Sequence, residues 1–253
     1  MPIPILERAA ANLATLKGNP YPGRGIIVGL DASGEHLVQA SFVTGRSPGS
    51  RNRRYILSGP GRVETEVADP TKEKGDPEKT IYAAMAGEAG FFVVSNGRQT
   101  DTVCQSRDSL MDNYFDKAMQ HYSYEDDSIS TPRITAACSI VSIPDKIVCR
   151  TVLSILRRSD YDDGCVRNLF QFEGLCPGIG HTLTTYLTDG DPPPTFRGEP
   201  FPLPLIFGNH TAEDIGQGLW DALNADNRVC LAVKIASLKT GQMVGDPFRI
   251  NKY

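Results

Sequence analysis

The sequence predicts an α+β fold with mostly antiparallel sheets covered by helices. Short apolar segments with strand-like alternation recur along the chain and are joined by brief turns, so hairpins predominate. Gly and Pro are abundant, at 24 and 18 of 253 residues, which favours many turns over a helical bundle. Helical periodicity is confined to roughly four segments, against about ten strands.

The first half of the chain predicts a leading helix followed by hairpins. The prolines of GNPYPG end that helix, because proline cannot continue the ladder of backbone hydrogen bonds. The expected helices lie at 4–17, at 77–90, where alanine is frequent, and at 108–122. The expected strands lie at 25–30, 36–45, 53–58, 62–68 and 91–95. The polar, Pro-bounded stretch 69–77 predicts a loop.

The second half is less regular. Strands are expected at 133–143, 146–156, 166–172, 181–187 and 227–238. A helix over 211–224 has Thr211 as its N-cap. The stretch 189–204 holds six prolines and predicts an exposed loop or a rigid polyproline wall. The tail 246–253 is expected to pair at a sheet edge.

Composition excludes several classes of protein. The net charge of −4 argues against a nucleic-acid binder, which normally carries a basic excess. The sequence contains neither an apolar run long enough for a membrane span nor a signal peptide, so we expect a cytoplasmic protein. Its six cysteines lack CxxC spacing and are expected to be small buried hydrophobes in a reducing compartment. Its four histidines form no pair at helical spacing, so no metal site is expected.

The densest polar feature is the loop 45–54, GRSPGSRNRR. Arginine forks, serine hydroxyls and glycine-exposed backbone N–H groups suit a bound phosphate or carboxylate. A solvated basic loop is the alternative. Two observations favour a ligand: apolar strands flank the loop, and a further arginine begins the first strand nearby in sequence. The candidate binding residues are Arg24, Arg46, Ser47, Arg51 and Asn52.

Two further segments combine hydrogen-bonding side chains with a strand end. SNGRQTDT at 95–102 carries Asn96, Asp101 and Thr102 directly after a buried strand, and it is either a simple turn or a polar ligand site. YEDDSISTPRI at 124–134 carries Glu125 and places Arg133 at the sheet rim, where a charge needs a partner. A solvated acidic loop is the usual alternative there.

Together these segments resemble the monofunctional, archaeal-type IMP cyclohydrolase family over residues 21–137. The resemblance rests on five collinear pieces: GRGIIVG at 23–29, the Arg-Ser to Asn-Arg loop at 46–53, the tyrosine-bearing helix at 77–88, VSNGRQTDT at 94–102 and the YEDD to TPRITAA stretch at 124–137. VSNGxxTDT followed by TPRIxAA is the most specific part. Beyond Cys138 the likeness is too weak to carry residues over.

The resemblance implies a reaction, a fold and residue roles. The reaction is closure of 5-formamidoimidazole-4-carboxamide ribotide to IMP with release of water. The fold would be a four-layer αββα sandwich like that of N-terminal nucleophile hydrolases, as one domain over 1–253 with 189–204 as an insertion. Met1-Pro2 does not supply the Ser, Thr or Cys nucleophile of those hydrolases, so their chemistry is excluded unless the chain is processed. Cyclisation needs no covalent intermediate.

By the same resemblance, Arg53 polarises an oxygen, Tyr82 donates to the developing oxyanion, and Glu125 moves the proton. Substrate contacts would come from Arg24, the loop 45–54, and Asn96, Asp101, Thr102 and Arg133. We expect a purine ribonucleotide as the only partner besides a second copy of the chain, whose presence is left open. No cofactor, metal, nucleic acid or membrane is expected. The alternative is a nucleotide-binding or regulatory protein on the same fold, without turnover.

Overall fold

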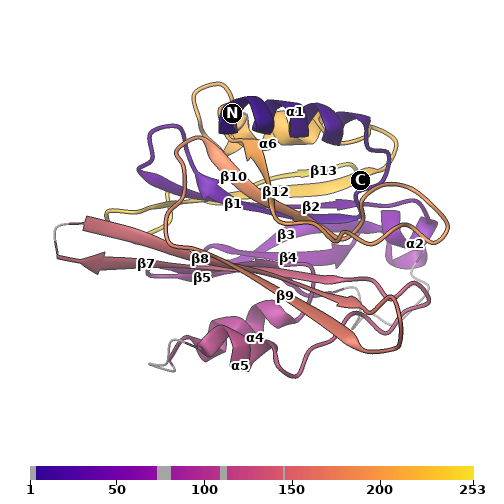
Figure 1. Ribbon diagram of the computed structural model, residues 1–253. Helices are drawn as coiled ribbons and strands as arrows, with labels where there is room; N and C mark the ends of the chain where they lie inside the picture. The colour runs from indigo at the N-terminus through magenta and orange to yellow at the C-terminus, as the bar shows by residue number, and fades with distance from the viewer. Residues whose placement is uncertain (1–3, 73–80, 109–112, 145) are drawn as a thin grey trace.

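The computed structural model describes residues 4–72, 81–108, 113–144 and 146–253. Two sheets lie one above the other, with helices on their outer sides (Figure 1). Every pairing between the strands of each sheet is antiparallel, which confirms an α+β fold with mostly antiparallel sheets. In the described part of the chain, no helix is long and apolar enough to cross a lipid bilayer.

The first sheet has six strands in the order β11-β10-β1-β2-β12-β13. Their bounds are β1 Arg24–Leu30, β2 His36–Thr44, β10 Ile179–Thr184, β11 Phe201–Pro204, β12 Arg228–Ser237 and β13 Phe248–Asn251. The expected hairpin at 25–45 is β1–β2 in the centre of this sheet, and the tail pairs at its edge as β13. Both faces of β1 are buried: Ile26 points to the inter-sheet core and Ile27 to the outer helices.

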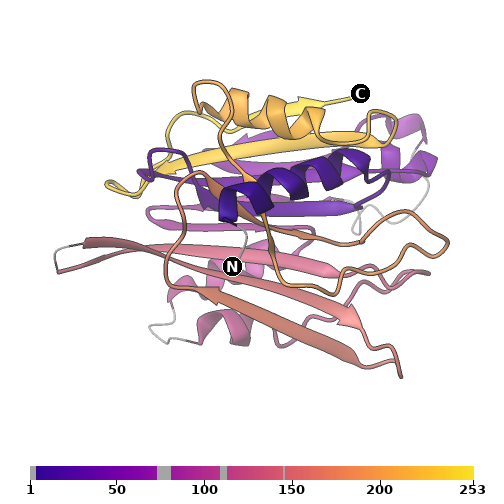
Figure 2. The same cartoon turned by 45° about the horizontal axis from the view of Figure 1, so that its top comes forward.

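Helices α1 (Ile5–Gly18) and α6 (Ala212–Asp221) cover the outer face of that sheet (Figure 2). Leu16 of α1 and Leu219 of α6 pack with Phe42 of β2 in one apolar cluster. Thr211 caps α6 as expected, its hydroxyl accepting the backbone N–H of Asp214 at 3.1 Å. Helical spacing groups Ile5 and Leu6 with Ala9, Leu13 and Leu16 on one apolar face, but Ile5 and Leu6 are exposed.

The second sheet has seven strands in chain order, β3 to β9. Their bounds are β3 Arg53–Gly59, β4 Arg62–Val67, β5 Ala83–Glu88, β6 Phe91–Ser95, β7 Arg133–Ile143, β8 Lys146–Arg158 and β9 Cys165–Phe172. Its outer face carries α4 (Gln99–Gln105) and α5 (Tyr114–Met119), which pack through Val103 and Phe115 onto Val93. The remaining short elements are α2 Pro48–Arg51, the 3-10 turn η1 Pro70–Lys72 and the 3-10 turn η2 Ser106–Asp108.

The prediction of a helix over 77–90 is wrong where the structure describes it. Residues 83–88 form strand β5, buried between β4 and β6, and Tyr82 precedes that strand. Alanine favours a helix locally, but Gly87 and Gly90 weaken one, and pairing on both sides buries residues 82–86. Residues 77–80 lie outside the described residues.

Two other expectations change in extent. The helix expected over 108–122 is described only as α5, with residues 109–112 outside the described residues. The Pro-rich stretch 189–204 ends in strand β11, which lies at a sheet edge where proline costs no ladder bond. All six cysteines are free, but Cys176 is exposed and Cys104 and Cys165 are only partly buried, so burial holds for Cys138, Cys149 and Cys230.

Candidate active site

The candidate site lies where alternate strands of the second sheet begin. Neighbouring strands there are antiparallel, so β3, β5 and β7 run in one direction and start at the same edge. Arg53 is the first residue of β3, Tyr82 directly precedes β5, and Arg133 is the first residue of β7. Arg24 begins β1 in the facing sheet, and Glu125 lies in the segment before β7. Residues far apart in sequence thus meet at one end of the two sheets.

The charges of these residues act on one another. Glu125 faces Arg133 across 3.7 Å. Burial raises the pKa of the Glu125 carboxyl, and the cations of Arg24 and Arg133 oppose that rise only in part. Burial disfavours the charge of Arg24, yet Glu125 and Tyr82 leave the Arg24 pKa above its usual range. Burial and the neighbouring Arg24 cation lower the pKa of Arg53.

Several donors in this group have no protein partner. Arg53 is 9% exposed and Tyr82 is 7% exposed. Among the described residues, nothing accepts a hydrogen bond from the Arg53 Nε, the Tyr82 hydroxyl or the Arg133 Nε. Burial also raises the pKa of Tyr82, so the phenol keeps its proton. Buried donors left unpaired are costly, and several of them at one place indicate a site built for a bound acceptor.

The acidic stretch 125–127 divides between two roles. The Asp127 carboxylate accepts bonds from the Thr131 backbone N–H at 2.9 Å and from the Thr131 hydroxyl at 2.5 Å, which closes the turn before β7. Asp126 is exposed. Glu125 is the one of the three that pairs with Arg133, and both side chains keep a fifth of their surface exposed. The group is therefore open to solvent beside Glu125.

Most polar side chains of the loop 45–54 form hydrogen bonds that hold the loop itself in place. The Ser47 hydroxyl accepts the Ser50 backbone N–H at 3.1 Å and caps α2. Arg51 donates to the Gly45 carbonyl at 3.0 Å and to Asn227 Oδ1 at 2.9 Å. Asn52 exchanges two hydrogen bonds with the Asp69 backbone, at 2.9 and 2.7 Å. These three residues hold the loop directly before Arg53 rather than point a free group into the site.

The SNG segment positions Arg133. Asn96 donates to the Pro132 carbonyl at 2.8 Å and accepts the Ile134 backbone N–H at 2.9 Å, so it brackets Arg133. Gln99 Oε1 accepts a bond from Arg133 Nη1 at 3.3 Å. A Cβ at Gly97 would lie 2.7 Å from the same Nη1, so a larger residue there would displace the end of the Arg133 side chain.

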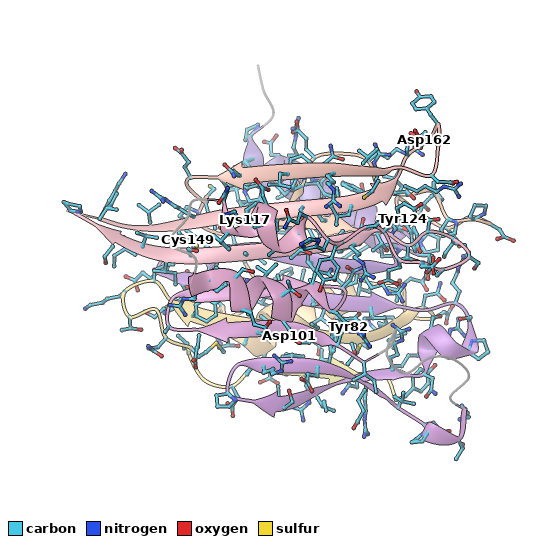
Figure 3. The ribbon with its side chains drawn as sticks, turned by 90° about the horizontal axis from the view of Figure 1, so that it is seen from below. Tyr82, Asp101, Lys117, Tyr124, Cys149 and Asp162 are labelled. Carbon is cyan, nitrogen blue, oxygen red and sulfur yellow. The ribbon has the colours of Figure 1, made fainter. Side chains whose placement is uncertain are left out.

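Asp101 and Thr102 are not brought into this group. Asp101 lies on α4, on the outer face of the second sheet (Figure 3), and both oxygens of its carboxylate accept bonds from Arg62, at 2.7 and 3.1 Å. Thr102 shares a 2.6 Å hydrogen bond with the Tyr122 hydroxyl, and the Tyr122 ring lies under the Arg133 guanidinium at 5.6 Å. Thr102 thus reaches the site only through Tyr122.

Two tyrosines beside Arg24 did not emerge from the sequence reasoning. The rings of Tyr21 and Tyr186 stack at 5.6 Å, and both phenols raise the pKa of Arg24. Gly23, with φ +76°, allows this contact because a Cβ there would lie 2.5 Å from the Tyr186 ring. Tyr21 stands two residues before the GRGIIVG piece at 23–29, and that position was a usable signal for it. Tyr186 lies beyond the segment that carried the resemblance, so no sequence signal pointed to it.

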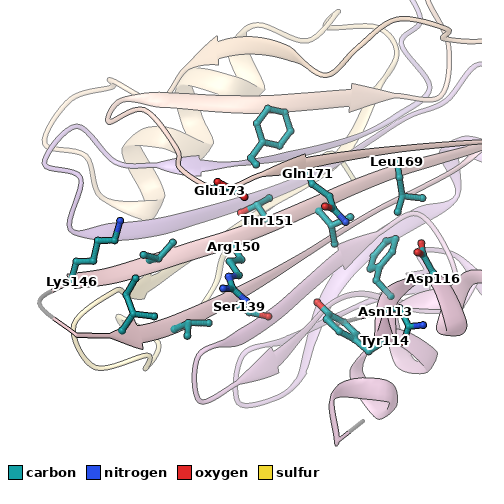
Figure 4. A pocket seen from close by; sticks show the side chains of 16 residues that line it. Asn113, Tyr114, Asp116, Ser139, Lys146, Arg150, Thr151, Leu169, Gln171 and Glu173 are labelled. Atoms are coloured by element: carbon teal, nitrogen blue, oxygen red, sulfur yellow. The ribbon is translucent and has the colours of Figure 1, made fainter. Parts of the chain in front are cut away.

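Two surface hollows lie elsewhere. One, of about 580 Å³, lies over β7–β9 beside α5 and is flanked by Lys146, Arg150 and Glu173 (Figure 4). The other, of about 570 Å³, is lined by Arg8, His181 and neighbouring residues. Neither is lined by a residue of the candidate site. Within the described ranges, no cluster of His, Cys, Asp and Glu side chains is arranged to hold a metal ion.

Comparison with known proteins agrees with the motifs. A family model described as IMP cyclohydrolase-like protein matches residues 21–241. The match extends well beyond residue 137 and includes the Pro-rich stretch 189–204, where the motifs alone gave no likeness. A comparison with curated proteins gives no match.

Proposed function

The chain belongs to the IMP cyclohydrolase-like family, and on that premise we propose that it closes the second purine ring. The substrate would be 5-formamidoimidazole-4-carboxamide ribotide and the products IMP and water. The observation that carries the proposal is the group of unpartnered buried donors on Arg53, Tyr82 and Arg133 around the carboxylate of Glu125. These donors and this carboxylate suit a ligand that offers several acceptor oxygens and whose reaction requires a proton transfer.

The first requirement of the reaction is that the substrate be held in its reactive conformation. The carboxamide nitrogen attacks the formyl carbon of the same molecule, so holding the reactive rotamer supplies much of the rate. The new C–N bond forms as the formyl C=O opens and charge develops on its oxygen. Arg53 and Tyr82 are the donors we assign to that oxygen, because preorganised donors in a water-poor site stabilise a developing oxyanion strongly.

Glu125 is the proton carrier in this proposal. It accepts a proton from the attacking nitrogen and returns one to the oxygen, which gives the carbinol. The C–O bond then breaks while the former formamido nitrogen loses its proton, so the oxygen leaves as water and the ring becomes aromatic. Burial raises the Glu125 pKa toward neutrality, which suits a group that both takes and gives a proton.

The order in which the helices and sheets are layered supports a more specific assignment of the fold. Helices α1 and α6, the two sheets, and helices α4 and α5 follow one another through the molecule. We propose that this order corresponds to the αββα sandwich of N-terminal nucleophile hydrolases.

The test is a direct assay. Purified protein is mixed with the formamido ribotide, without metal or folate, and IMP formation is followed by absorbance beside a titration with IMP. We expect IMP formation well above the uncatalysed rate together with IMP binding. IMP binding without turnover would favour the nucleotide-binding alternative, and absence of both would overturn the proposal.

A further inference from the structure

The Pro-rich stretch begins against the arginine loop of the candidate site. The guanidinium of Arg46 donates from Nη1 to the carboxylate of Asp189 and, at 2.8 Å, to the carbonyl of Gly190. Figure 1 shows the chain after β10 reaching the end of the molecule where α2 lies. The Pro-rich stretch carries none of the motifs, yet it binds Arg46, which belongs to the motif loop 45–54.

Arg46 is the outermost member of a stack that leads to the site. Its guanidinium lies 4.4 Å above the centroid of the Tyr21 ring, and Tyr21 stacks on Tyr186. The Tyr186 hydroxyl shares a 2.8 Å hydrogen bond with the Thr131 hydroxyl, and the Thr131 carbonyl accepts the Glu125 backbone N–H at 2.8 Å. The stack thus ends at the segment that carries the candidate proton carrier.

The four arginines of the loop differ in which donors they leave free. Arg51 is engaged by the Gly45 carbonyl and Asn227, and Arg54 pairs with Glu66. Arg53 is buried at the strand start. Arg46 uses only Nη1, and among the described residues nothing accepts from its Nε or Nη2. A half-exposed guanidinium with an unused pair of donors suits the bidentate binding of a phosphate group.

We propose that Arg46 binds the phosphate of the ribotide and that Asp189 is a positioning residue, which holds Arg46 over Tyr21. This inference rests on the proposed function. Asp189 and the Gly190 carbonyl hold one nitrogen of the fork, which fixes the guanidinium and leaves its Nε and Nη2 for a ligand. The Pro-rich stretch is therefore part of the substrate-binding apparatus.

The experiment compares Arg46→Ala and Asp189→Asn with Asp221→Asn. Asp221 is an exposed carboxylate that pairs with Arg228 at 3.4 Å on the far helix α6. Inhibition of ring closure by IMP and by inosine separates phosphate binding from binding of the rest of the ligand. We expect IMP to bind roughly 10- to 100-fold more weakly to Arg46→Ala and about 3- to 10-fold more weakly to Asp189→Asn.

Inosine inhibition should be unchanged in both variants, and KM for the ribotide should rise in Asp189→Asn while kcat stays the same. Asp189→Glu should recover part of the loss, and Asp221→Asn should behave as the wild type. Equal losses for IMP and inosine, or unchanged IMP binding in Asp189→Asn, would overturn the inference while the proposed function stands. A wild-type protein that neither forms nor binds IMP would overturn both.

Discussion

Arg53 and Lys234 are both buried cations with an unpartnered nitrogen, and their surroundings differ. Arg53 lies beside Arg24 and within the field of Glu125, at a place that opens to solvent. Lys234 is 1% exposed between the two sheets, with its Nζ 5.7 Å from the centroid of the Phe92 ring. Within the described residues, no acceptor reaches the Arg53 Nε or the Lys234 Nζ.

The two side chains meet the cost of burial in different ways. Burial lowers the pKa of Lys234 to about 7, so the amine can shed its charge near neutral pH. A guanidinium cannot lose its proton at any accessible pH, so Arg53 stays charged and still requires a hydrogen-bond acceptor. An unpartnered buried arginine beside a carboxylate therefore indicates a ligand, whereas an isolated buried lysine indicates a neutral core residue.

The largest expected effect is that of Arg53→Lys, which removes the fork but keeps a cation. We expect kcat for ring closure to fall by roughly 10²- to 10³-fold, because a donor at the developing oxyanion is lost. Arg54→Lys is the matched control, since Arg54 is exposed and pairs with Glu66 outside the site. Steady-state kinetics of both variants measure the effect. Equal rates for the wild type and Arg53→Lys would remove Arg53 from the mechanism.

Glu125→Gln should be nearly as severe, with kcat lower by about 10²-fold or more, because an amide cannot carry the proton. In the wild type, protonation of Glu125 should reduce kcat on the acid side. Since the Glu125 pKa is raised by burial, this acid limb should lie above the usual range of a carboxyl group. The pH profile of kcat checks both points, with Asp126→Asn as the control. An acid limb that persists unchanged in Glu125→Gln would assign it to another group.

Lys234→Met should affect stability rather than activity. The folded protein binds fewer protons at Lys234 than the unfolded chain between pH 7 and about 10.5, so wild-type stability should rise with pH across this window. Below pH 7 the cost is complete, at roughly 4 to 5 kcal/mol for a shift of this size. The variant should therefore be several kcal/mol more stable at neutral pH, with an advantage that shrinks as pH rises.

Urea unfolding of Lys234→Met and of the wild type at several pH values between 6 and 10 measures the difference in their stability. The contributions of other titrating groups cancel in this difference, because both proteins contain them. The nearby Cys104, Cys138 and Arg62 are present in both proteins. Ring closure should proceed at the wild-type rate. A variant less stable than the wild type at pH 7 would show that Lys234 is stabilised in place, as Arg53 would be by its ligand.

The smallest effect is expected for Asp101→Asn. Asp101 pairs with Arg62 on the outer face, and half-exposed ion pairs contribute at most about 1 kcal/mol to stability. We expect kcat/KM within about twofold of the wild type and a loss of stability below about 1 kcal/mol. A tenfold rise in KM would place Asp101 at the substrate, as the motif alone suggested.

Local sequence patterns identified the hairpins and the pieces of the site. The alternation at 25–45 and the Thr211 cap were readable because register and capping depend on adjacent residues. The helix expected at 77–90 failed because alanine favours a helix in isolation, whereas β5 forms by pairing with β4 and β6 on both sides. Asn96 and Asp101 lie in one motif, and nothing local distinguished the residue that brackets Arg133 from the one on the outer face.

The sequence by itself determined the α+β class, the central hairpins, the family and the residues able to carry charge and protons. Only the tertiary structure decided which of them meet. Arg24, Arg53, Tyr82 and Arg133 come together because alternate strands of an antiparallel sheet start at one edge and the facing sheet brings β1 to it. The same packing buries donors that no described residue accepts from, and it brings Asp189, remote in sequence, onto Arg46. Burial and long-range contacts are properties of the folded chain, and no local pattern specifies them.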